Sequence, residues 1–75
     1  MLYACDDRST LAVRFSADGN QAFVERPGQP ALMLPRQVSA SGFLYETPQY
    51  ALRGKADEAM WTVGRRVPVQ CRVSS

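Results

Sequence analysis

Ser41 and Lys55 are the residues with the clearest potential for chemistry, because a serine beside a lysine can act as a nucleophile with its general base. Neither residue stands in a motif that would activate it, and the chain of 75 residues contains no histidine. We therefore favour a surface serine and a solvated lysine, and keep a Ser-Lys hydrolase only as a minor alternative.

The remaining reactive side chains give no catalytic arrangement either. Asp6-Asp7 and Asp57-Glu58 are neighbours in the sequence, and adjacent residues on a strand point to opposite faces. Neither pair therefore resembles the two carboxyl groups of a glycosidase. We expect Trp61 and the three tyrosines to be core or surface aromatics rather than a sugar platform. The sequence predicts a binding protein that has no catalytic residue, no metal and no cofactor.

The two cysteines, Cys5 and Cys71, lie near opposite ends of the chain. A domain of this size buries only about 60% of the surface that its unfolded chain exposes, so its core alone is marginal. A disulfide between these cysteines would stabilise the fold by about 4 kcal/mol. Two free thiols or half of a metal site are the alternatives, although a zinc site would lack ligands. We favour the disulfide, which indicates an oxidising compartment such as the periplasm or the cell surface.

Charge and hydropathy exclude several classes of partner. Nine Lys and Arg residues against seven Asp and Glu give a net charge of +2, and no basic cluster is interleaved with aromatics, so we expect no nucleic-acid partner. Arg65-Arg66 is interpreted as a solvated turn. No apolar run approaches the roughly 20 residues of a membrane span. Because the first residues lack signal-peptide features, we interpret Met1 as the start of a mature fragment; an upstream lipid anchor and a homodimer stay open.

Apolar and polar residues alternate along most of the chain, as in Leu11, Val13 and Phe15, which would share one face of a strand. Turn residues such as Asp18-Gly19 separate the alternating segments. Strands are predicted over residues 11–15, 21–26, 31–34, 43–46, 49–53, 58–63 and 67–73, the last with Val67, Val69, Cys71 and Val73 facing inward. About seven or eight short strands indicate one all-β domain over residues 1–75, a small antiparallel β-barrel whose first and last strands the cysteines would join.

One stretch does not fit a strand. Val38-Ser39-Ala40-Ser41-Gly42 has poor strand propensity and little to bury, yet it lies between two apolar segments. We predict a shaped loop here, in a chain too short to carry many residues without a role.

Together these motifs resemble the MliC/PliC family of bacterial inhibitors of C-type lysozyme. The pattern begins with Tyr3-x-Cys5, Leu11-x-Val13-x-Phe15 and Asp18-Gly19, and its most specific part is Ser39-Ala40-Ser41-Gly42-x-x-Tyr45. It continues through Tyr50, Lys55, Asp57-Glu58-Ala59 and Cys71, so the resemblance covers nearly the whole chain.

The resemblance implies an eight-stranded barrel, in the periplasm or anchored to the outer membrane, whose partner is a C-type lysozyme. By position, Ser41 would place its hydroxyl by the catalytic carboxylates of the lysozyme, and Lys55 would bring an ammonium to them. Ser39, Gly42 and Tyr45 would shape and support the loop. The rival interpretation is an envelope module that binds peptidoglycan or another envelope protein on the same scaffold.

The chain departs from the family pattern in two respects. The family usually reads Lys-Gly-Asp-Glu-Ala, whereas here Gly54-Lys55-Ala56 places the glycine before the lysine, and Tyr50-Ala51-Leu52-Arg53 lacks a tryptophan. Arg53 is therefore a second candidate for the inserted cation. The net charge of +2 also provides no long-range attraction to lysozymes of this type, which are usually basic.

Overall fold

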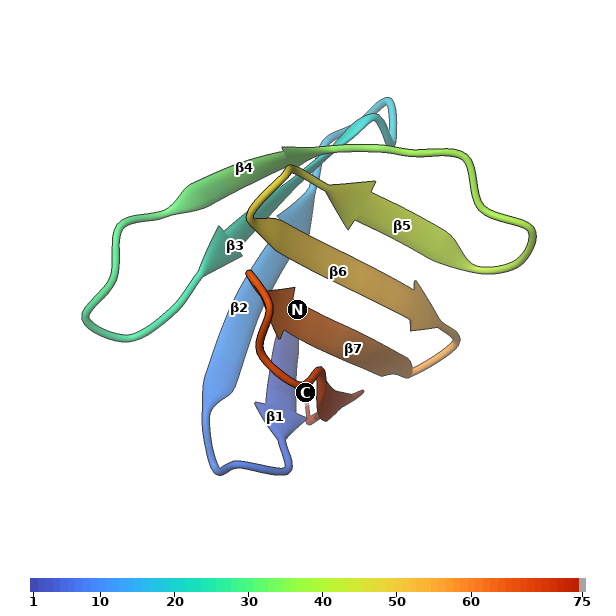
Figure 1. The fold of residues 1–75 in the computed structure, drawn as a ribbon. Helices are drawn as coiled ribbons and strands as arrows, with labels where there is room; N and C mark the ends of the chain where they lie inside the picture. Colours follow the sequence, from blue (N-terminus) through green and yellow to red (C-terminus); the bar gives the residue numbers. More distant parts are fainter. Residues whose placement is uncertain (75) are drawn as a thin grey trace.

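The computed structural model describes residues 1–74, in which eight β-strands form one antiparallel sheet that curves into a nearly closed barrel (Figure 1). The strands are β1 (Leu2–Cys5), β2 (Thr10–Phe15), β3 (Gln21–Glu25), β4 (Leu32–Pro35), β5 (Phe43–Glu46), β6 (Tyr50–Lys55), β7 (Glu58–Val63) and β8 (Val69–Val73). Their order in the sheet is β4-β3-β2-β1-β8-β7-β6-β5. The predicted all-β barrel is confirmed.

Alternation along the strands builds the core. Leu11, Val13, Ala59 and Trp61 are buried, as their spacing predicted, while Arg14 is exposed. The residues paired across neighbouring strands share a face: Val13 pairs with Val24, and Leu52 pairs with Trp61. The barrel interior is therefore filled by apolar side chains, and no charged side chain among residues 1–74 is buried.

Cys5 and Cys71 form the predicted disulfide. They are direct cross-strand partners in the β1–β8 pairing, with a Cα–Cα distance of 3.9 Å. The bond therefore joins the first strand of the barrel to the last.

The barrel closes between β4 and β5 through few backbone contacts. Arg36 forms an isolated bridge with Tyr45, and the Gln37 N–H donates to the Leu44 carbonyl at 2.8 Å. Side chains add to this closure, because the Phe15 ring centroid lies 5.3 Å from that of Phe43 and 5.5 Å from that of Tyr45. An aromatic cluster thus joins β2 to β5 across the interior.

Two predicted strand boundaries differ from the structure by two residues, and the other predicted boundaries agree to within one residue. The last strand begins at Val69 rather than Val67, and Val67, predicted to face inward, is 84% exposed. Proline has no N–H to donate and restricts the residue before it, so Pro68 delays the start of the ladder. Gly54 and Lys55, left between the strands predicted over 49–53 and 58–63, instead end β6, and Gly54 pairs with both Phe43 and Ala59. Residues 1–74 contain no helix long and apolar enough to cross a membrane.

Candidate binding groove at the Ser41 loop

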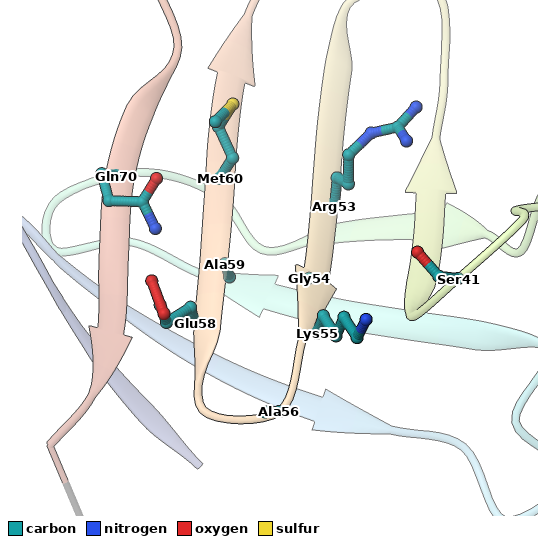
Figure 2. A pocket seen from close by; sticks show the side chains of 9 residues that line it. All are labelled: Ser41, Arg53, Gly54, Lys55, Ala56, Glu58, Ala59, Met60 and Gln70. Carbon is teal, nitrogen blue, oxygen red and sulfur yellow. The ribbon is translucent and has the colours of Figure 1, made fainter.

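An open groove of about 400 Å³ lies on the outer face of the barrel, beside the loop that joins β4 to β5. Its floor follows the cross-strand row of Arg53, Met60 and Gln70, which are register partners on β6, β7 and β8. Figure 2 shows Ser41 at the side of this row. The lining residues are Ser41, Arg53, Gly54, Lys55, Ala56, Glu58, Ala59, Met60 and Gln70.

Gly42 holds the serine loop against β6. Its φ is +67°, and a Cβ at this position would overlap the carbonyl oxygen of Gly54 and lie 3.0 Å from the Cβ of Lys55. Only a residue without a side chain allows the two backbones to approach so closely. The contact therefore places Ser41, the residue before Gly42, next to the end of β6.

The serines of the loop differ in what they bind. The Ser39 hydroxyl donates to the Ser41 carbonyl at 2.7 Å and so closes the loop on itself. Ser41 is exposed, and its hydroxyl forms no hydrogen bond with any of residues 1–74. The Ser41 side chain is thus available to a partner, while Ser39 shapes the backbone beneath it.

Gly54 explains why the glycine precedes Lys55 in this chain. A Cβ on Gly54 would overlap the ring of Phe43 and lie 2.9 Å from the Glu58 carbonyl oxygen. The ring thus occupies the space that a side chain at position 54 would need. Gly54 therefore serves the packing of the Phe15–Phe43–Tyr45 cluster.

Lys55 is the last residue of β6 and is exposed. Figure 2 shows its side chain extending toward the Ser41 side of the groove, whereas Glu58 points away from it. Glu58 instead lies 3.7 Å from the Arg72 guanidinium, an exposed pair of small energetic weight. Among residues 1–74, no carboxylate lies within salt-bridge distance of the Lys55 ammonium.

Ala56 keeps the hairpin turn after Lys55 despite the lost glycine. Its φ is +57°, a left-handed conformation that glycine adopts without a steric penalty. The two-residue turn Ala56–Asp57 then leads into β7, with Lys55 paired to Glu58. The altered sequence thus retains the hairpin and stores strain at Ala56.

The predicted site residues therefore fall into two groups. Ser41, Arg53 and Lys55 line the groove together, and Gly42 borders it. Tyr45 is only 5% exposed and lies in the core, so it can act on the surface only by supporting the loop. Met60, Gln70 and Glu58 also line the groove but were not predicted. The alternating pattern places these three residues on the outer face of the sheet. It does not indicate which outward-facing residues on different strands lie next to one another.

The groove offers hydrogen bonding and positive charge rather than catalysis. Ser41 and Lys55 are both exposed, so neither sits in the shielded environment that a nucleophile and its base need. No group of three His, Cys, Asp or Glu side chains within residues 1–74 could hold a metal ion. A protein surface or a ligand with acceptor groups is the kind of partner that this arrangement fits.

Over residues 3–70 the chain matches the MliC family, described as membrane-bound lysozyme-inhibitor of c-type lysozyme. The chain belongs to this family. MliC proteins are lysozyme inhibitors and not enzymes, so the alternative of a Ser-Lys hydrolase was wrong. Membership in the MliC family implies inhibition of C-type lysozyme, and the family is described as membrane-bound. No curated protein and no solved structure matches the chain.

Proposed function

We propose that this MliC domain inhibits C-type lysozyme by inserting Ser41 and Lys55 into the active-site cleft. The observation that supports this is the contact of Gly42 with Gly54 and Lys55, which puts a free hydroxyl and a free ammonium on one open groove. Two short segments, separate in the sequence, thus form one surface at the edge of this groove.

The chemistry of the target suits these two groups. Lysozyme-type catalysis requires one protonated and one ionised carboxyl group in a partly desolvated cleft. An inserted ammonium forms charge-assisted hydrogen bonds with the carboxylates and favours the ionised form of the catalytic acid. The desolvation of Lys55 is offset because it meets an opposite charge. The serine hydroxyl is small and can donate to one carboxylate while it accepts from another group.

We assign the inserted cation to Lys55 rather than Arg53. Lys55 ends β6 directly before the turn, and its Cβ adjoins the Gly42 backbone. Arg53 lies two residues farther into the strand, over the floor of the groove with Met60. Lys55 is therefore the cation that can move together with Ser41 into a cleft, and Arg53 would contact its rim.

The energy of binding should come from fit rather than from long-range attraction. The inhibitor carries a net charge of +2, which does not steer it toward a basic enzyme. We place its action in the bacterial cell envelope, in the periplasm or at the outer membrane through a lipid anchor, where inhibition of lysozyme protects peptidoglycan. The Cys5–Cys71 disulfide agrees with an oxidising compartment.

A lysis assay tests the proposal. The domain is titrated into C-type lysozyme acting on bacterial cells, and Ser41→Ala, Lys55→Ala, the double variant and Arg53→Ala are compared with the wild type. Loss of a charge-assisted hydrogen bond costs about 1.5–3 kcal/mol, so we expect Lys55→Ala to weaken inhibition by at least about tenfold. Arg65→Ala is the control, because it removes one positive charge outside the groove.

The outcomes separate function from mechanism. Full inhibition by the double variant would exclude Ser41 and Lys55 from the mechanism. Absence of inhibition by the wild type would contradict the proposed function, and capture of peptidoglycan or of an envelope protein without any effect on lysozyme would favour the alternative of an envelope module.

A further inference from the structure

A second cavity, of about 500 Å³, occupies the mouth of the barrel. The β1–β2, β3–β4 and β7–β8 connections surround it, while the Ser41 loop and the Ala56–Asp57 turn lie at the other end (Figure 1). Mostly exposed residues form its rim and more buried apolar residues its floor. The rim consists of Asp7, Arg8, Ser9, Thr10, Arg26, Pro27, Arg66 and Val67, and the floor of Leu11, Trp61, Val63 and Val69. The cavity is therefore separate from the groove assigned to lysozyme.

Arg26 is held across this mouth by aromatic rings. Its guanidinium carbon lies 5.3 Å from the ring centroid of Tyr50 and 5.8 Å from that of Trp61, and the two rings stack at 5.9 Å. Arg26 follows β3, whereas Tyr50 lies on β6 and Trp61 on β7. Stacking fixes the plane of the guanidinium, and a fixed guanidinium is preorganised to bind a carboxylate or phosphate through two hydrogen bonds.

The Arg26 side chain has a buried hydrogen-bond donor without an acceptor in the described part of the chain. Its Nε is buried and has no hydrogen-bond partner among residues 1–74. Buried polar groups are nearly always paired, so an unpaired donor on the wall of a cavity indicates a missing acceptor. An anionic oxygen in the cavity would offset this deficit by accepting from the terminal nitrogens of the same guanidinium.

The charge of the mouth favours an anion. Arg8 and Arg66 line the cavity with Arg26, and Asp7 is the sole acidic residue in the lining. The Asp7 carboxylate already accepts hydrogen bonds from the Ser9 N–H at 3.0 Å and the Ser9 hydroxyl at 2.5 Å. Within residues 1–74 no salt bridge joins Asp7 to an arginine. The lining therefore carries three guanidinium groups against one carboxylate, and a net positive charge remains within the cavity.

We propose that the barrel mouth binds a small amphiphilic anion, an apolar chain that ends in a carboxylate or a phosphate. The acidic group pairs with Arg26 and Arg66, Arg8 adds positive charge beside them, and the chain lies on Trp61 and Val69. The volume falls within the roughly 300–1,000 Å³ of small-molecule sites. The same chemistry occurs in a free acyl anion and in an anionic lipid of a membrane. This inference does not rest on the lysozyme proposal, since the two sites share no lining residue.

Trp61 provides the readout, because it is the single tryptophan of the chain and lines the cavity. We would titrate the folded domain with octanoate and with octyl phosphate below their micelle concentrations and follow Trp61 emission. Octyl glucoside, which has the chain without the charge, and inorganic phosphate, which has the charge without the chain, are the matched controls. We expect a saturable change with the two amphiphilic anions and binding at least about tenfold weaker with either control.

Variants identify the groups that bind. Arg66→Ala should weaken octanoate binding by about five- to tenfold, because it removes one charged donor. Arg65→Ala, which removes the neighbouring charge outside the lining, should leave it unchanged. Arg26→Lys keeps the charge but loses the planar fork and should weaken binding more strongly than Arg66→Ala. If Arg26→Lys does not fold, the octanoate affinities of Arg66→Ala and Arg8→Ala are compared with that of Arg65→Ala. Weaker binding by the first two variants alone would still support the proposed site.

Vesicles distinguish the two sources of the anion. Sedimentation with phosphatidylglycerol vesicles but not with phosphatidylcholine vesicles, weakened by Arg66→Ala, would identify a membrane lipid; binding of octanoate alone would identify a free acyl anion. Equal effects of Arg65→Ala and Arg66→Ala, or no response to any anion, would overturn the proposal. Inhibition of lysozyme by Arg66→Ala should match the wild type, which separates a failure here from a failure of the inhibitor assignment.

Discussion

The Tyr45 hydroxyl donates a 2.7 Å hydrogen bond to the carbonyl of Gly19. Tyr45 lies on β5, and Gly19 lies in the turn between β2 and β3. The bond therefore joins β5, at one end of the sheet, to the β2–β3 turn, beside the seam where β4 and β5 are linked by an isolated bridge. A motif residue of the serine loop thus acts by closing the barrel beneath that loop.

Tyr45→Phe tests this closure. The variant keeps the ring in the aromatic cluster but leaves the Gly19 carbonyl without its donor, so we expect the free energy of unfolding to fall by about 1 kcal/mol. Urea denaturation measures it. Tyr50→Phe is the control, because the Tyr50 hydroxyl forms no hydrogen bond with residues 1–74. Equal losses in the two variants would show that the Tyr45 bond does not stabilise the fold.

Gly42→Ala should displace the serine loop. Both Gly42 and Gly28 have positive φ, +67° and +74°, but a Cβ on Gly28 meets nothing within 4 Å, whereas one on Gly42 overlaps Gly54. Each alanine costs about 1–2 kcal/mol for the left-handed backbone. Only Gly42→Ala should also weaken inhibition of lysozyme in the lysis assay. Retention of full inhibition by a folded Gly42→Ala domain would contradict the loop-insertion mechanism.

Ala56→Gly should stabilise the domain. Ala56 has a φ of +57°, and glycine removes the steric cost of this conformation, a gain of about 1 kcal/mol after the added entropy of the unfolded chain. Ala17→Gly is the matched control, because Ala17 also lies in an exposed turn but does not have a positive φ. We expect urea denaturation to show a higher midpoint for Ala56→Gly and a lower one for Ala17→Gly. A lower midpoint for both would mean that Ala56 is not strained.

Reduction of the disulfide should remove much of the stability. The bond closes a loop with a sequence separation of 66 residues, for which the chain-entropy relation gives about 4 kcal/mol. Urea denaturation with and without a thiol reductant measures the difference. The double variant Cys5→Ala with Cys71→Ala should start at the lower midpoint and not respond to reductant. Identical midpoints of the wild type in both conditions would contradict this prediction.

Acid should weaken the β2–β3 turn through Asp18. The Ser16 hydroxyl and the Asn20 N–H donate to this carboxylate and lower its pKa below the ordinary 3.8. A lowered folded pKa stabilises the protein above the unfolded value, and this contribution is lost as the pH falls through the folded pKa. Asp18→Asn should therefore flatten the decline of the urea midpoint below pH 3.8. Asp57→Asn is the matched control, because it removes a charge of the same sign from another exposed turn.

The sequence alone determined the class of the fold. Alternation in segments such as Leu11 to Phe15 indicated strands, because a pleated strand with one buried face imposes a period of two residues. The cysteine count and the absence of histidine favoured the disulfide, since so small a core is marginal on its own and a zinc site would lack ligands. The Ser39–Tyr45 motif also located the serine loop and indicated the family.

Tertiary structure alone decided how the site is assembled. Gly54 appeared to be a turn residue, yet it ends a strand because the Phe43 ring occupies the space of its missing side chain. Arg26 follows β3 and Trp61 lies on β7, and these two strands are not neighbours in the sheet. The two side chains meet only because the sheet curves into a barrel. Periodicity reports the face of a residue and not its partners across the molecule. The groove at Ser41 therefore depends on the pairing of β5, β6, β7 and β8, whereas the mouth at Arg26 depends on closure of the barrel.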